Sequence, residues 1–197
     1  MRIESIKVQN YRVFQNVEVN NIPNMAVFLG MNGVGKTTFF DVFGFLHDAL
    51  QSNIRAALAK RGGFSEVISR GQEGDIEFEI KFRPSNEEPI ITYQLSICLQ
   101  DNNRPAIKKE VMRFRRGQTG APWKVLDFSF GTGVAADGDL NRYEDVRLAD
   151  RSEQRLDSPD ILAIKGLGQF KEFIAVSQLR RLIEDWYVSD FHIECLL

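Results

Sequence analysis

One short segment near the start of the chain has the residue types and spacing of a phosphate-binding loop. Residues 30–37, GMNGVGKT, match the pattern G-x-x-x-x-G-K-[ST] at every fixed position. Glycines let the backbone adopt positive φ angles and come close to a ligand, so that successive N–H groups can point at phosphate oxygens. Lys36 would add a positive charge, and the hydroxyl of Thr37 suits Mg²⁺, which prefers oxygen ligands. The segment therefore predicts nucleotide binding.

The predicted phosphate cradle extends from the loop into the first turn of a following helix, whose positive dipole end favours anions. The residues expected to bind nucleotide are Gly30, Asn32, Gly33, Val34, Gly35, Lys36, Thr37 and Thr38. Thr37 is also expected to hold Mg²⁺ through its hydroxyl. The alternative interpretation is a glycine-rich turn that contains Gly-Lys-Thr by chance.

Apolar segments flank this loop on both sides. Residues 25–29 form a short continuous apolar run between Pro23 and Gly30, which is typical of a strand buried on both faces. Residues 37–50 carry apolar side chains at a period of 3.6 and predict an amphipathic helix. Strand, loop and helix follow in the order that the phosphate-binding motif requires.

The elements around this unit predict an α/β fold. Strict alternation of apolar and polar residues, separated by turn residues, predicts antiparallel strands. The expected strands are residues 2–8 with a hairpin partner at 17–20, then 75–82, 91–99, 107–115 and 123–130. We expect residues 1–130 to form the loop-containing and antiparallel β part, residues 131–160 a polar loop or insertion, and residues 161–197 the start of a helical part.

Composition excludes several classes of protein. The 197 residues are 43% hydrophobic and 26% charged with a net charge of −2, so the chain is neither disordered by composition nor strongly basic. No apolar run reaches the length of a membrane span, and the start lacks a secretory signal, so a cytoplasmic protein without membrane association is expected. Two cysteines and two histidines, Cys98, Cys195, His47 and His192, lack the spacing of a metal site.

Three stretches resemble the ATP-binding-cassette-type heads of the AAA/SMC-like ATPases, which include RecF, RecN, SMC and OLD-family proteins and bacterial anti-phage ATPases. Residues 3–14 (IESIKVQNYRVF) are similar to the opening strand and its N-[FY]-[RK]-x-F turn. Residues 28–46 resemble the loop and helix of this family, including Asn32, and the antiparallel strands follow as they do in such heads. The resemblance covers roughly the first 130 residues. It implies ATP and Mg²⁺ as ligands.

The resemblance also implies roles for residues outside the loop. Arg12 matches an arginine or lysine that lies near the nucleotide in this family; the alternative is a solvated turn arginine. Gln169 is the best-placed candidate for the glutamine (the Q-loop) that joins nucleotide-bound Mg²⁺ to the helical part. Gln72 is a second candidate, although it precedes the strands, and a plain surface role is the alternative for both glutamines.

Two catalytic motifs of the family are not found in the sequence. These are the L-S-x-G-type signature and the Walker B strand, four apolar residues followed by Asp-Glu. Glu184 and Asp185 follow only two apolar residues and read as exposed helix positions. We therefore expect the N-terminal half of a head, lacking the C-terminal half, and leave open whether it hydrolyses ATP.

The resemblance implies a second ATPase head as partner, either a homodimer or a complementary half, with DNA or an effector protein as further candidates. DNA repair, chromosome handling and phage defence all use such heads. The alternatives are a non-catalytic nucleotide-binding or interaction fragment and a small P-loop kinase or GTPase. Lys109, Arg113 and Arg115 share strand parity and could touch DNA phosphates, but a solvated charged face is favoured.

Overall fold

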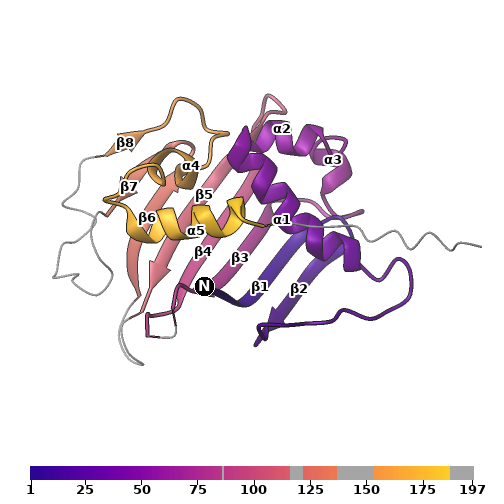
Figure 1. The fold of residues 1–197 in the computed structure, drawn as a ribbon. Coiled ribbons are helices and arrows are strands. Elements are labelled where there is room, and N and C mark those ends of the chain that lie inside the picture. The colour runs from indigo at the N-terminus through magenta and orange to yellow at the C-terminus, as the bar shows by residue number, and fades with distance from the viewer. Residues whose placement is uncertain (86, 116–121, 137–152, 187–197) are drawn as a thin grey trace, which may run out of the picture.

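The computed structural model describes residues 1–85, 87–115, 122–136 and 153–186. One sheet dominates it, with antiparallel neighbours in the order β2-β1-β3-β4-β5-β6-β7-β8 (Figure 1). The strands are β1 (Arg2–Tyr11), β2 (Phe14–Asn20), β3 (Ile76–Arg83), β4 (Ile91–Leu99), β5 (Pro105–Phe114), β6 (Trp123–Ser129), β7 (Thr132–Ala135) and β8 (Gln154–Arg155). The strands predicted from alternation are thus confirmed, and β1 and β2 are longer than expected.

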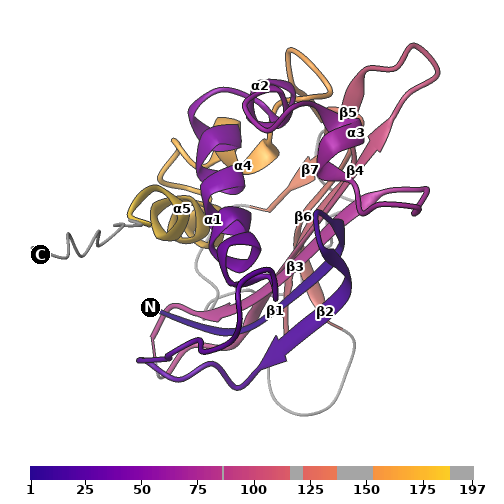
Figure 2. The ribbon, with the colours of Figure 1, turned by 90° about the vertical axis from the view of Figure 1, so that its right-hand side faces the viewer.

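The helices lie on one face of this sheet (Figure 2). They are α1 (Lys36–Gln51), α2 (Ile54–Ala59), α3 (Phe64–Val67), α4 (Ala163–Leu167) and α5 (Ile174–Glu184). The predicted helix after the glycine-rich loop is confirmed as α1, and the helical periodicity after residue 161 is confirmed as α4 and α5.

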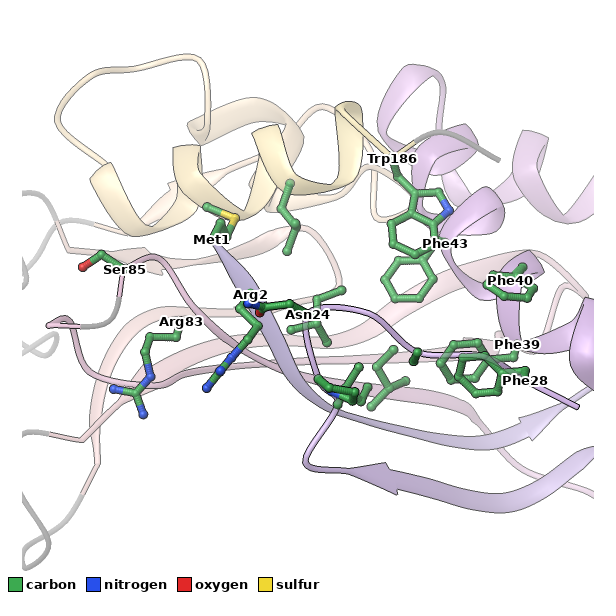
Figure 3. A pocket seen from close by; sticks show the side chains of 16 residues that line it. Met1, Arg2, Asn24, Phe28, Phe39, Phe40, Phe43, Arg83, Ser85 and Trp186 are labelled. Carbon is green, nitrogen blue, oxygen red and sulfur yellow. The ribbon is translucent and has the colours of Figure 1, made fainter. Parts of the chain in front are cut away.

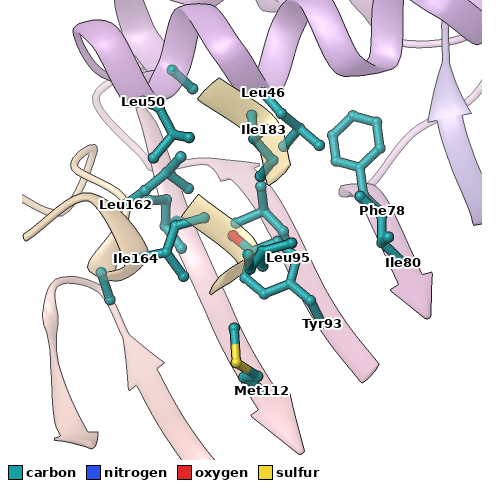
Figure 4. Close-up of a cluster of buried hydrophobic side chains, with 14 of the residues drawn as sticks. Leu46, Leu50, Phe78, Ile80, Tyr93, Leu95, Met112, Leu162, Ile164 and Ile183 are labelled. Carbon is teal, nitrogen blue, oxygen red and sulfur yellow. The ribbon is translucent and has the colours of Figure 1, made fainter. Parts of the chain in front are cut away.

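The core fills the space between the helices and the covered face of the sheet. On β3 the side chains of Ile76, Phe78, Ile80 and Phe82 point inward, and Phe78 pairs with Leu95 of β4 in the sheet register. Leu46 and Leu50 of α1, Ile164 of α4 and Ile183 of α5 pack over these strands (Figure 4). The period-2 pattern of the strands and the period-3.6 pattern of α1 therefore meet in one buried layer.

The predicted buried strand at residues 25–29 is wrong for the described structure. These residues form no strand, and Met25, Val27 and Leu29 are 84%, 71% and 89% exposed. The sheet offers them no open neighbour beside β1, because β2 and β3 occupy both sides of that strand. An apolar run becomes a buried strand only where it pairs with another strand, and no described strand pairs with residues 25–29.

Two short strands, β7 and β8, lie within the region 131–160 that was expected to be a polar loop or insertion, and the division of the chain at these bounds stays a prediction. Phe130 and Gly131 both adopt positive φ angles, of 49° and 80°, and turn the chain back so that β7 pairs with β6. A Cβ on Gly131 would lie 3.2 Å from Cα of Pro159, so the later part of this region packs against the turn. Residues 137–152 lie outside the described residues, as do Cys195, His192 and the rest of 187–197.

Candidate nucleotide-binding site

The glycine-rich loop leads directly into α1. Gly35 is the N-cap residue of the helix and has a left-handed conformation with φ of 98°. The side chain of Thr37 is exposed in the first turn, whereas that of Thr38 is buried against the core. Of the two threonines, only Thr37 thus presents its hydroxyl to solvent at the helix start, as the predicted Mg²⁺ ligand must.

Lys36 is held within the loop that it would serve. Its Nζ donates hydrogen bonds to the carbonyl oxygens of Gly30 and Met31, at 2.6 and 2.8 Å. These bonds close the loop around the ammonium group, so that a positive charge and the free N–H groups of the first helical turn lie together. This combination fits an oligophosphate.

Glycine is required at two positions of the loop for different physical reasons. Gly33 has φ of 85° with open space where a Cβ would stand, so its requirement is conformational alone. At Gly35 a Cβ would lie 2.5 Å from Cε1 of Phe14 and 3.2 Å from Cγ2 of Val13. The turn between β1 and β2 therefore presses directly on the loop.

Arg12 lies in that same turn and is fixed by several contacts. It has φ of 53°, and its backbone N–H donates to the carbonyl of Val67 at 2.6 Å. The carbonyl of the nearby Phe14 accepts a 2.9 Å hydrogen bond from the buried hydroxyl of Ser69. The Nε atom of Arg12 lies 2.7 Å from Oδ2 of Asp41 on α1. The structure thus brings Arg12 beside the loop and its helix, and its role in binding nucleotide stays a prediction.

Asp41, which sequence reasoning did not single out, is the centre of a charged network. Besides Arg12 it accepts a hydrogen bond of 2.8 Å from the Tyr11 hydroxyl and one of 2.9 Å from Nε of Arg61. Arg61 also donates to Asp48 at 2.8 Å. Burial, and then the neighbouring Asp41 carboxylate, raise the pKa of the Tyr11 hydroxyl well above its usual value. The helical spacing of Asp41 from Thr37 was the signal available in the sequence.

The two glutamines proposed for the Q-loop are not brought to the loop by any described contact. Gln169 is exposed, and its side-chain amide donates to the carbonyl of Lys165 at 3.3 Å, one turn back. Gln72 is exposed as well, and its backbone N–H donates to Ser69. Glu184 is half-buried on α5, where it pairs with Arg180 at 2.8 Å.

A cavity of about 570 Å³ lies behind the apolar segment 25–29 rather than at the mouth of the loop. Phe28, Phe39, Phe40, Phe43 and Trp186 line one side of it, and Arg2 and Arg83 lie toward the other end (Figure 3). Phe43 and Trp186 stack at 3.9 Å between ring centroids. The aromatic side chains of α1 thus pack against one another and against Trp186 at this cavity.

Two basic side chains of β5 contact acidic partners. Lys108 contacts Asp75 at 2.6 Å, and Arg113 lies 3.9 Å from Glu79. This face is therefore of mixed charge rather than a positive strip. In the part of the chain that the structure describes, no helix has the length and apolar character to cross a bilayer, and no cluster of His, Cys, Asp and Glu could hold a metal.

Comparison with known proteins identifies a family match and two curated relatives of this chain. The AAA ATPase domain family matches residues 1–175. Among curated relatives, the "DNA replication and repair protein RecF" of Lactococcus lactis subsp. lactis (strain IL1403) is 27% identical over 129 residues, which are 66% of this chain and 33% of the relative. The protein of the same description from Corynebacterium jeikeium (strain K411) is 28% identical over 93 residues, 44% of this chain and 22% of the relative.

One solved structure is described as "Structural biochemistry of ATP-driven dimerization and DNA stimulated activation of SMC ATPases". It has a TM-score of 0.40 and 19% identity, and covers 60% of this chain and 73% of that chain.

The chain belongs to the AAA ATPase domain family. The resemblance to AAA/SMC/RecF-like ATPases and the predicted α/β fold class, with antiparallel strands followed by helices, are thereby confirmed. The chain spans 33% and 22% of the lengths of the two curated relatives.

Proposed function

We propose that this chain binds ATP with Mg²⁺ in the loop at residues 30–37, as the nucleotide-binding part of a RecF/SMC-like ATPase that acts on DNA. The observation that carries the proposal is the loop itself: Lys36 sits against the carbonyls of Gly30 and Met31 at the start of a 16-residue helix. Family membership supports ATP as the nucleotide. DNA is supported by the curated relatives, which are described as DNA replication and repair proteins.

The residues of this loop fit a Mg-nucleotide. The N–H groups of the first helical turn and the Lys36 ammonium would bind the phosphates, and Thr37 would hold the metal through its exposed hydroxyl. Bound Mg²⁺ would neutralise part of the phosphate charge. Because the sequence contains no Walker B strand, we propose that hydrolysis requires a complementary ATPase part.

The first test measures by calorimetry how tightly the purified chain binds Mg-ATP, and compares it with the Lys36→Ala variant. Removing the ammonium deletes a charge-assisted contact to phosphate, so we expect Kd to rise at least about a hundredfold. Lys165→Ala is the matched control, because Lys165 also donates to backbone carbonyls, those of Gln51 and Ser52, but at the far end of α1. Equal binding by wild type and Lys36→Ala would contradict the proposal.

Phosphate release in the same samples tests the second half of the proposal. We expect no turnover above that of Lys36→Ala even where ATP binds. Clear Lys36-dependent turnover would show that a catalytic carboxylate lies within this chain, with Glu184 and Asp185 the first to substitute.

The exposed segment 25–31 supports the proposed complementary part. Met25, Val27, Leu29 and Met31 alternate along it and are 71–89% exposed, while Ala26 and Phe28 line the cavity. Within the described residues, no backbone-to-backbone hydrogen bond involves residues 23–34. The segment also carries no charged side chain of the kind that protects exposed strand edges. We propose that an apolar strand of the complementary ATPase part pairs with it.

This predicts that the isolated chain self-associates through residues 25–31. We expect the double variant Val27→Glu and Leu29→Glu to reduce light scattering several-fold without lowering the melting temperature, because both side chains lie in solvent. Phe170→Glu is the control, since Phe170 is 54% exposed on another part of the surface. Scattering that falls equally in the control would contradict a specific role for the segment.

A further inference from the structure

Arg12 and Arg61 both contact Asp41, yet the two guanidinium groups are in different situations. Arg61 is 9% exposed, and its Nε, Nη1 and Nη2 atoms all have partners: Asp41, Asp48 and the carbonyl of Ala57. Arg12 is 38% exposed and touches Asp41 through Nε. Within the described part of the chain, its two terminal nitrogens have no partner. Arg61 is therefore satisfied by the fold, whereas Arg12 retains donors for another group.

Asp41 lies near the start of α1 and holds Arg12 there. Asp41 follows Thr37 by four residues on α1, so both side chains lie on the same helix face one turn apart. The turn that carries Arg12 also presses on Gly35 through Val13 and Phe14. An arginine held at Asp41 is thus held next to the start of the helix and the loop.

Asp41 is itself fixed from two further directions. The buried Tyr11 hydroxyl donates to the same Oδ2 atom that Arg12 contacts, and Arg61 donates to Oδ1. A carboxylate with both oxygens engaged has little freedom to rotate, so it can fix the orientation of a guanidinium. Guanidinium groups bind phosphate with their terminal nitrogens.

We propose that Asp41 is a positioning residue: it holds Arg12 by Nε beside the glycine-rich loop, so that the terminal nitrogens of Arg12 bind phosphate oxygens of the nucleotide. This inference rests on the proposed nucleotide site. It assigns to Asp41 an effect on affinity that acts through Arg12.

The test is the affinity for Mg-ATP, and separately for inorganic triphosphate, of the variants Asp41→Asn, Arg12→Ala and the two combined. We expect each single variant to raise Kd by about tenfold and the double variant to add no more than about twofold, because both remove the same contact. The effect should persist with triphosphate, which has no base or ribose.

Asp48→Asn is the matched control. Asp48 lies on the same helix, has the same 21% side-chain exposure as Asp41 and also accepts from Arg61, but does not contact Arg12. It should lower the melting temperature about as much as Asp41→Asn and leave Kd within about twofold of wild type. The inference would be overturned if Asp41→Asn left Kd unchanged, or if the effects of Arg12→Ala and Asp41→Asn on Kd were independent. It would also be overturned if the effect appeared with ATP but not with triphosphate, or if Asp48→Asn raised Kd equally. Absence of Lys36-dependent binding in the wild type would overturn the proposed function and this inference together.

Discussion

We expect Gly35→Ala to abolish nucleotide binding and to destabilise the fold by about 2–4 kcal/mol, because it combines backbone strain with a steric clash. Gly35 has φ of 98°, a backbone angle that residues other than glycine rarely adopt. An added Cβ would also lie 2.5 Å from the ring of Phe14. Phe14 is only 8% exposed and cannot swing into solvent without leaving the core. The clash would therefore push the β1–β2 turn away from the loop, or the loop away from the helix.

Gly33→Ala separates the two causes. Gly33 also has a positive φ, of 85°, but nothing lies within 4 Å of its added Cβ. We expect this variant to cost only the strain of the left-handed conformation, about 1–2 kcal/mol. Urea unfolding and calorimetric titration with Mg-ATP measure both effects. Adding Phe14→Ala to Gly35→Ala should relieve the clash and restore part of the binding. Equal losses in the two glycine variants would show that contact with Phe14 has no influence.

The sequence correctly predicted the elements that a repeating hydrophobic pattern determines locally. Alternation over residues 75–82 and 91–99 and the apolar face of residues 37–50 correspond to β3, β4 and α1, because each pattern repeats within one element. The segment at 25–29 shows the limit of this reasoning. Its apolar run identifies residues that favour burial, but whether they form a strand depends on pairing, and no described strand pairs with them.

Local sequence patterns could not predict contacts between residues that lie far apart in the chain. Arg12 was singled out through family resemblance, but its partner Asp41 lies on another element, and no pattern within either segment records their contact. Glu110 directly follows Lys108 and Lys109 in β5, yet it is buried because the N–H groups of Ala163 and Ile164, more than 50 positions later, fold onto it. Such groups become visible only when the tertiary arrangement is known.

Glu110 is the buried carboxylate that joins the sheet to the helical part. It is 1% exposed and accepts hydrogen bonds from Ala163 N at 2.6 Å, Ile164 N at 3.0 Å and the Tyr93 hydroxyl at 3.1 Å. Removing the carboxylate would leave these buried donors without partners. We therefore expect Glu110→Leu to lower the free energy of unfolding by about 3 kcal/mol in urea unfolding at neutral pH. A loss below about 1 kcal/mol would show that water replaces the carboxylate.

The same residue makes stability depend on pH. Burial raises the pKa of Glu110 from its ordinary value of 4.5 to about 7, although the N–H groups of Ala163 and Ile164 act in the opposite direction. The folded protein thus holds this proton more tightly than the unfolded chain. Its contribution to stability is therefore full below about pH 4.5 and is lost as the pH rises through about 7.

Glu110→Gln isolates that contribution, because the amide has the shape of the acid but does not ionise in this range. Between pH 5 and pH 8 we expect the free energy of unfolding of the wild type to fall by about 2 kcal/mol more than that of Glu110→Gln, in urea titrations at several pH values. The difference must shrink toward the acid side, where the wild-type side chain is protonated and neutral like the amide. Parallel curves for the two proteins would show that Glu110 ionises alike in the folded and unfolded states, so that its donors, rather than its burial, would determine its charge.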